Sequence, residues 1–200
     1  SSMLNLKGRY APVATKEIAR EHITAFEQEL SARLGFAATL TSGQAKAVEL
    51  IATTKDAVIG VQGQAGTGKT TMVNVVNSIA HAQGYTMVGL AQSGSATETL
   101  FEETGIKSHT LDSFIFRTQQ NQETYGPRFA EKEIWLIDEA SLANAGHFAD
   151  VITAARQSGA RIVFTGDTAR FQRGHPGIAT HAVFQMHYRL TGMQLCKVTN

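Results

Sequence analysis

The segment from Gly63 to Thr70 constrains the fold of this chain more than any other feature of its sequence. It reads Gly63-Gln64-Ala65-Gly66-Thr67-Gly68-Lys69-Thr70 and fits the pattern G-x-x-x-x-G-K-[ST]. An apolar run, residues 58–61, precedes it, and a stretch suited to a helix follows. Glycines let backbone N–H groups approach a phosphate chain, and the start of the following helix favours the same anion. A chance glycine-rich turn would not need this flanking strand and helix, so the motif predicts a phosphate-binding loop.

Lys69 and Thr70 carry the predicted chemistry of this loop. The Lys69 ammonium would reach the β- and γ-phosphates of a nucleoside triphosphate, and the Thr70 hydroxyl would ligate Mg²⁺. Thr71 completes the predicted nucleotide-binding set that starts at Gly63. The expected cofactors are therefore ATP and Mg²⁺.

Apolar runs and amphipathic stretches alternate along most of the chain, which is typical of a parallel α/β sheet. Expected strands are 57–61, 86–90, 134–137 and 161–165, and expected helices between them are 69–83, 95–104, 110–120 and 144–158. A helix over 15–34, with Thr15 as N-cap and Gly35 as its end, and a second from Thr41 to about residue 55 precede them. The polar stretch 119–128 reads as an exposed loop. The fold class is thus a P-loop NTPase domain, with a mainly parallel sheet and helices on both of its faces. An N-terminal helical segment precedes this domain.

The overall composition limits the possible partners and settings. Eighteen Lys and Arg against 17 Asp and Glu give a formal charge of +1, so nucleic-acid contact must be local. Cys196 is the one cysteine, which excludes an internal disulfide and agrees with a reducing cytosol. No apolar stretch approaches the ~20 residues of a membrane span, so we expect no membrane insertion.

Asp138 and Glu139 follow the apolar run 134–137, at the strand end where ligands bind in open α/β sheets. Asp138 would hold Mg²⁺, directly or through water, and Glu139 would orient or deprotonate the attacking water. The alternative makes Asp138 a helix N-cap and Glu139 a first-turn acid. Together with the upstream loop, the pair predicts hydrolysis as well as binding.

The last expected strand runs into Gly166 and Asp167. Polar groups at this strand end would face the γ-phosphate, where they can report whether it is present. A turn residue is the other interpretation of Asp167.

The combination of these motifs resembles superfamily 1 helicases of the RecD-like, 5′-to-3′ branch. The loop at 63–70, Asp-Glu-Ala-Ser at 138–141 and Thr-Gly-Asp at 165–167 resemble motifs I, II and III of that family. The lead-in, 8–21, is similar to the helix that precedes the motor in TraI-type conjugative relaxase-helicases. The resemblance implies a helical lead-in over 1–40 and a first RecA-like, ATP-binding domain over 41–200.

The resemblance also assigns residues to the base and to DNA. Gln44, within Thr-Ser-Gly-Gln at 41–44, would bond the adenine edge. The segments 89–96 and 110–114 match motifs that line the single-stranded DNA path, and the DNA-contacting candidates there are Gln92, Ser93, Ser95, Thr110, Ser113 and Phe114. His109, just before the second segment, either faces DNA or is a partly buried structural residue.

Two motifs depart from the family pattern. Gln92, Ser93 and Ser95 replace a proline, a threonine and a lysine, which removes one contact to the DNA backbone. In motif III, Arg170 stands where the family has glutamine, and Gln172 follows two residues later. Arg170 could contact phosphate, bind the DNA backbone or be a solvated charge, and the sequence leaves these three roles open.

The resemblance implies a second RecA-like domain that supplies arginines to the γ-phosphate, and we expect it beyond Asn200. The isolated chain would then bind nucleotide and turn it over weakly. Expected partners are single-stranded DNA, that second domain and the conjugation or secretion machinery, in a bacterial cytoplasm. One rival is a degenerate module that binds nucleic acid or recruits proteins without turnover. Another is a P-loop kinase, for which no lid or acceptor site is evident.

Overall fold

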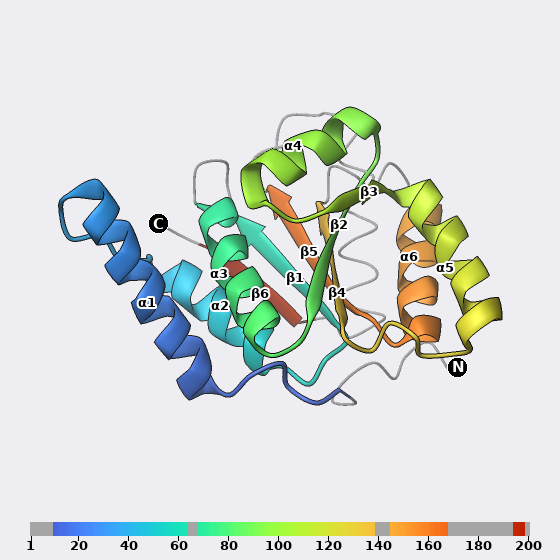
Figure 1. Cartoon of the computed structure of the whole chain (residues 1–200), viewed down its shortest axis with the longest axis horizontal. Helices are drawn as coiled ribbons and strands as arrows, with labels where there is room; N and C mark the ends of the chain where they lie inside the picture. Colours follow the sequence, from blue (N-terminus) through green and yellow to red (C-terminus); the bar gives the residue numbers. More distant parts are fainter. Residues whose placement is uncertain (1–9, 64–67, 139–144, 168–193, 199–200) are drawn as a thin grey trace.

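A parallel sheet organises the part of the chain that the structure describes. The computed structural model describes residues 10–63, 68–138, 145–167 and 194–198 (Figure 1). The strands are β1 (Val58–Gly63), β2 (Thr86–Ala91), β3 (Ser108–Thr110), β4 (Glu133–Asp138), β5 (Arg161–Asp167) and β6 (Gln194–Val198). The helices are α1 (Lys16–Leu34), α2 (Ser42–Thr53), α3 (Lys69–Ala82), α4 (Gly94–Thr104), α5 (Leu111–Tyr125) and α6 (Ala145–Ser158). None of these helices is both long enough and apolar enough to cross a membrane.

The strands pair in the order β3-β2-β4-β5-β1-β6, and every pair is parallel. Parallel strands need a crossover between them, and from β1 to β5 a helix lies in each connection. The predicted mainly parallel sheet is confirmed, and the four predicted strands correspond to β1, β2, β4 and β5. The two strands at the edges of the sheet, β3 and β6, were not predicted.

Side chains of the central strands alternate between two hydrophobic cores. On β4, Ile134 and Leu136 pack into the core that also contains residues of α1, α2 and α3. Trp135 and Ile137 pack into the other core, which contains residues of α5 and α6. Figure 1 shows α5 and α6 together on one side of the sheet. Since successive strand residues point to opposite faces, a strand buried on both faces must be apolar throughout. Helices on both faces, as predicted, follow from this pattern.

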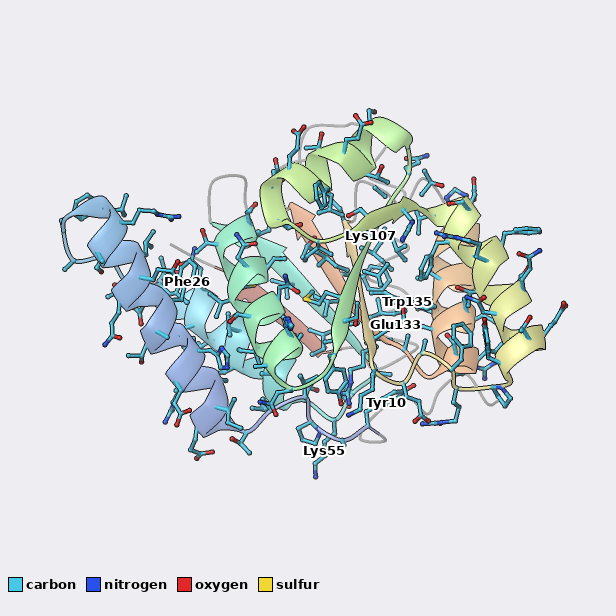
Figure 2. The ribbon with its side chains drawn as sticks, viewed as in Figure 1. Tyr10, Phe26, Lys55, Lys107, Glu133 and Trp135 are labelled. Carbon is cyan, nitrogen blue, oxygen red and sulfur yellow. The ribbon has the colours of Figure 1, made fainter. Side chains whose placement is uncertain are left out.

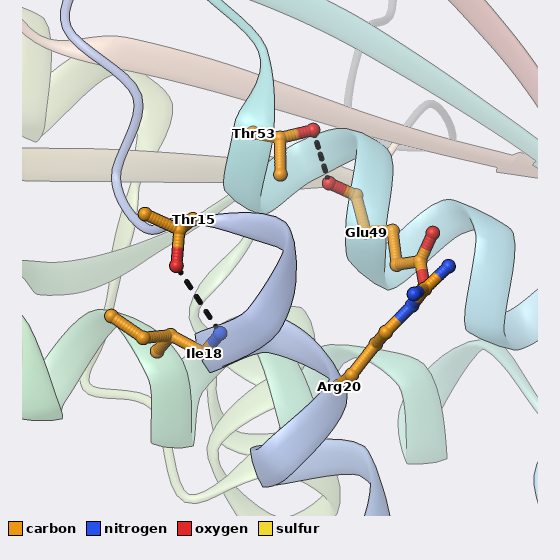
Figure 3. Close-up of polar contacts among 5 residues, drawn as sticks. All are labelled: Thr15, Ile18, Arg20, Glu49 and Thr53. Atoms are coloured by element: carbon orange, nitrogen blue, oxygen red, sulfur yellow. Dashed lines mark hydrogen bonds and ion pairs between the residues drawn. The ribbon is translucent and has the colours of Figure 1, made fainter.

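Helix α1 is capped as the sequence indicates, and it is tied to α2 by an ion pair (Figure 3). Thr15 caps α1, because its hydroxyl accepts a hydrogen bond of 3.3 Å from the Ile18 N–H. Gly35 ends the helix with a left-handed φ of 79°. Arg20 of α1 pairs with Glu49 of α2 at 2.9 Å. Both predicted helix ends are confirmed, and α1 shares its core with the sheet.

The segment before α1 is held against the opening residue of β5. The buried guanidinium of Arg161 donates to the Ala11 carbonyl and, at 3.3 Å, to the Tyr85 hydroxyl. It lies between the Tyr10 and Tyr85 rings, 5.1 and 5.3 Å from their centroids. The Tyr10 N–H donates to the Lys55 carbonyl at 3.0 Å (Figure 2). This segment therefore lies at the amino ends of the strands, away from the predicted site.

Helix α5 corrects one prediction. The stretch 119–128 was expected to be a loop, but α5 continues through residue 125 and ends only at Gly126, whose φ is 83°. Gln and Glu form helices well, and a helix that covers little core needs no apolar periodicity.

Two phenylalanines test the assignment of the core. Phe164 on β5 is fully buried, whereas Phe116 on α5 is 60% exposed. We expect Phe164→Ala to lower the free energy of unfolding by about 3–5 kcal/mol, because it leaves a cavity. Phe116→Ala should stay within about 0.5 kcal/mol of the wild type. Urea unfolding of both variants measures this, and similar losses would contradict the described packing.

Candidate nucleotide-binding site

The carboxyl ends of the three central strands meet at one edge of the sheet. Gly63, at the end of β1, is in register with Asp167 of β5. Asp138, at the end of β4, is in register with Thr165 of the same strand. The start of α3, at Lys69, follows the loop from β1. The predicted phosphate loop, the first predicted acid and the predicted sensor segment thus share one edge, as parallel pairing requires.

Gly68 gives α3 an N-terminus suited to a phosphate. It is the N-cap residue, with a φ of 74°, a conformation that glycine adopts without strain. N-cap residues usually offer a side-chain oxygen to the first-turn N–H groups, and glycine has none. These N–H groups and the positive end of the helix dipole can therefore serve an anion. The backbone here fits the phosphates of a nucleotide.

The Lys69 side chain crosses from α3 to β5. Its Nζ donates a hydrogen bond of 2.9 Å to the backbone carbonyl of Gly166. The ammonium is thereby held at the carboxyl edge of the sheet, beside the end of β5. Sequence reasoning assigned Gly166 to phosphate sensing and missed its contact with Lys69, since a main-chain carbonyl has no signature in the sequence.

Thr70 and Asp138 carry side-chain oxygen atoms at the same edge. Both residues are exposed, one in the first turn of α3 and the other at the end of β4. A hydroxyl and a carboxylate suit Mg²⁺, which takes oxygen ligands and keeps several waters. Their exposure leaves room for those waters. The donor set therefore fits Mg²⁺, which would neutralise phosphate charge when bound.

Gln44 lies beside Gly68, the residue before α3, and is 7% exposed. Its Oε1 accepts from the Thr41 N–H at 2.9 Å, and the Thr41 hydroxyl accepts from the Gln44 N–H at 3.2 Å. This reciprocal capping box begins α2. The Gln44 Nε2 donates to the Gly68 carbonyl at 3.2 Å. The spacing of Thr41 and Gln44 is itself a capping-box signature, which the sequence analysis did not use.

Two candidate DNA-contacting segments begin helices at neighbouring strand ends. Ser93 caps α4 after β2, and its hydroxyl accepts from the Ala96 N–H at 3.2 Å. Thr110 precedes α5 and donates to the Ser113 hydroxyl at 2.7 Å. Because β2 and β3 are adjacent and parallel, both helix starts lie at one edge of the sheet. Gln92 and Ser95 are exposed there as well.

Phe114 connects this edge to the core. Its ring stacks on that of His109, with centroids 5.7 Å apart, and meets the Trp135 ring edge-on, with centroids 4.9 Å apart. Arg117 Nη2 donates to His109 Nδ1 at 2.8 Å. Because arginine only donates, Nδ1 must be unprotonated. Burial first, and then the charges of Arg117 and Lys107, lower the pKa of His109.

Several predicted site residues lie outside the part of the chain that the structure describes. They are Gln64, Ala65, Gly66 and Thr67 of the loop, the predicted base Glu139, and Arg170 and Gln172 of the third motif. For Asp167 the backbone is described as the end of β5, but the side chain is not. The roles predicted for these residues stay predictions.

A family model described as an AAA domain matches residues 39–197. A probable conjugal transfer protein TraA of Sinorhizobium fredii is 33% identical over 144 residues, which are 72% of this chain and 13% of that protein. Conjugal transfer protein TraA of Rhizobium radiobacter is 31% identical over 182 residues, or 91% of this chain and 16% of that protein. The multifunctional conjugation protein TraI of Escherichia coli K12 is 32% identical over 142 residues, which are 69% of this chain and 8% of that protein.

Among solved structures, the cytoplasmic domain of the Type VII secretion ATPase EccC of Thermomonospora curvata is similar, with a TM-score of 0.42 and 12% identity. The match covers 69% of this chain and 20% of that chain. The relatives in conjugal transfer agree with the resemblance that the motifs indicated, which is thereby confirmed.

The lowered pKa of His109 predicts a pH-dependent contribution to stability. His109 binds a proton less readily in the folded state than in the unfolded chain. Its contribution to stability is therefore complete above the ordinary histidine pKa of about 6.5 and is lost as the pH falls below it. Urea unfolding at about pH 7.5 and about pH 5.5 measures the loss, which should be smaller in His109→Gln. Because the other histidines titrate in both proteins, the difference between the two losses isolates His109. Equal losses would contradict the prediction.

Proposed function

We propose that this chain, which belongs to the AAA domain family, hydrolyses ATP to drive movement along single-stranded DNA. The premise is that it is a helicase-like ATPase domain related to conjugal transfer proteins. One observation carries the proposal. The Lys69 ammonium at the start of α3 is held at the sheet edge where Asp138 ends β4. A cationic side chain and a carboxylate on the same edge suit phosphoryl transfer from a nucleotide with Mg²⁺.

Each site residue would have its own role in ATP hydrolysis. Lys69 and the backbone of the loop, up to Gly68, hold the phosphates, while Thr70 and Asp138 ligate Mg²⁺. Glu139 takes a proton from the attacking water or orients it. Gly166, bonded to Lys69, lies where the sensor segment of β5 begins.

The proposed DNA contacts lie at the ends of β2 and β3. Ser93 and Thr110 begin helices at that edge, and hydroxyl and backbone N–H groups bind phosphate without reading sequence. Phe114 is partly buried against His109 and Trp135, so it would serve DNA binding by supporting this surface. Exposed positive charge comes from Lys107 and Arg117 next to it.

The chain spans 13% to 16% of two TraA relatives and 8% of TraI. Translocation, the arginines of a second RecA-like domain, contact with the conjugation machinery and a place in the bacterial cytoplasm are therefore proposals about a longer protein. ATP binding is the part of the function that the described residues support most directly, since Gly68 and Lys69 both belong to it.

Lys69→Ala tests the proposed motor. The substitution removes the cation that would stabilise charge on the transferred phosphoryl group, so ATP hydrolysis should fall at least about 100-fold. Hydrolysis is measured with and without single-stranded DNA, on this chain and on a form that continues past Asn200. Lys107→Ala is the matched control, since it removes an exposed lysine just before β3 and should leave DNA-independent hydrolysis unchanged. DNA binding without hydrolysis by the longer wild-type form would favour the degenerate module instead.

Glu139→Gln separates binding from hydrolysis. The amide keeps the size of the side chain but cannot accept a proton, so the DNA-stimulated rate should fall at least about 100-fold. The dissociation constant for ATP, measured by calorimetry, should change little. Loss of ATP binding, or turnover equal to the wild type, would show that Glu139 is not the proposed base.

A further inference from the structure

Polar and ring contacts hold residues 10–12, the start of the segment before α1, at the amino ends of the strands. The Ala11 carbonyl accepts a hydrogen bond from Arg161 Nη2. The Tyr10 ring lies on the same guanidinium, with Cζ 5.1 Å from the ring centroid. The Tyr10 N–H donates to the Lys55 carbonyl at 3.0 Å (Figure 2). Because Tyr10 is only half-buried and Ala11 and Pro12 are exposed, these residues depend mainly on the listed polar and ring contacts.

The next two residues are fixed more firmly. Val13 and Ala14 are buried in the core that contains residues of α1, α2 and α3. The Ala14 N–H donates to the Ala52 carbonyl of α2 at 3.0 Å. Pro12 restricts its own φ and biases Ala11 toward extended backbone, so residues 10–12 are stiff. A stiff, exposed piece of chain therefore joins a buried one between Pro12 and Val13.

Arg161 holds residues 10–12 at an electrostatic cost. It is buried, and no carboxylate among the described residues forms an ion pair with it. Its Nε and Nη1 are buried as well and have no hydrogen-bond partner in the described part of the chain. Burial of a charge is unfavourable unless the charge is paired and its N–H groups are bonded. The docked arrangement meets this requirement only in part.

Release of residues 10–12 would lower that cost. The guanidinium lies between two rings, with Cζ 5.1 Å from the Tyr10 centroid and 5.3 Å from the Tyr85 centroid. If Tyr10 moves away, water reaches the open face of the guanidinium. Water also replaces the lost partners of the Ala11 carbonyl and the Tyr10 N–H. Hydration of a buried charge thus offsets the contacts that are broken, so the docked and released arrangements are close in free energy.

We propose that residues 10–12 form a strap, which docks on Arg161 and detaches from it while Val13 and Ala14 stay in the core. While docked, the strap sets the direction in which the polypeptide before Tyr10 leaves the domain. When the strap is released, that polypeptide can move relative to the folded domain. The strap lies at the amino ends of the strands, opposite the edge with Lys69, so the proposal does not depend on nucleotide binding.

Hydrogen exchange of backbone amides, followed by NMR, measures the opening of the strap. The Tyr10 amide reports on the strap and the Ala14 amide on its fixed end, because each donates a hydrogen bond of 3.0 Å. In the wild type, Tyr10 should be protected relative to an unfolded chain, with a protection factor at least about tenfold lower than that of Ala14. An unprotected Tyr10 amide would show that the strap is not docked. Equal protection at both positions would show that it does not open alone, and either result would overturn the proposal.

Two variants weaken the docked strap. Tyr10→Leu removes the ring from the guanidinium but keeps the backbone donor. Arg161→Lys keeps the positive charge, but an ammonium has no planar face to lie between two rings. Each should lower the protection factor at residue 10 about fivefold or more, as the loss of a cation–π contact predicts, and leave Ala14 unchanged. If Arg161→Lys fails to fold, Tyr10→Leu still provides the test, because that side chain is half-buried at the surface. Unchanged protection at residue 10, or an equal loss at Ala14, would overturn the proposal.

Lys132→Ala is the matched control for these variants. Its Nζ lies 4.4 Å from the Tyr85 centroid, so the substitution removes a cation from the ring that is not part of the strap. Protection of the Tyr10 amide should stay at the wild-type value. A loss as large as that in Tyr10→Leu would show that Tyr10 responds to any change near Tyr85, which would contradict a strap held by Arg161.

Chemical modification gives a second readout of release. Phenylglyoxal reacts with guanidinium groups that are accessible to the reagent, and mass spectrometry locates the modified arginines. Arg161 should react faster in Tyr10→Leu than in the wild type, while the exposed Arg33 should react at the same rate in both proteins. Equal rates at Arg161 would show that the Tyr10 ring does not control access to the guanidinium, and would overturn the proposal.

Discussion

The hydrogen-bonded register of the parallel sheet is the constraint on which the rest of this structure depends. Once β1, β4 and β5 pair side by side in the same direction, their carboxyl ends must lie at one edge. Residues far apart in the sequence then become neighbours, as Lys69 and Gly166 do across 97 positions. A one-residue slip would also exchange the two faces of a strand, and would turn Ile134 and Leu136 away from their core. Packing on both faces therefore fixes the register, and the register fixes the site.

The strands that were predicted differ from β3, which was missed, in how much core they cover. β4 and β5 are buried on both faces, so they appear in the sequence as continuous apolar runs. β3 is three residues long, Ser-His-Thr, and lies at an edge of the sheet, so nothing in its composition required a strand. The far half of α5 was missed for a related reason, since Gln and Glu dominate it and it contributes little to either core.

In the candidate site, too, some features were predicted from the sequence and others were missed. Lys69, Thr70 and Asp138 were predicted to share one edge, because their motifs follow strands that had to be parallel. The partners of Lys69 and Gln44 could not be predicted, because the acceptors are the carbonyls of Gly166 and Gly68. Any residue can supply a carbonyl, so only the folded backbone shows which one lies within reach. The capping box at Thr41 is the exception, since its spacing was readable in the sequence.

Glycine at position 68 illustrates how these contacts combine. Its left-handed φ of 74° alone would cost another residue about 1–2 kcal/mol, which a stable domain can tolerate. A Cβ atom at position 68 would lie 2.0 Å from the Gln44 Nε2, which is far closer than two non-bonded atoms can approach. The Gln44 amide would therefore have to move. Its movement would break the hydrogen bond from Nε2 to the Gly68 carbonyl. Position 68 is therefore restricted both by its backbone dihedral and by the close approach of Gln44.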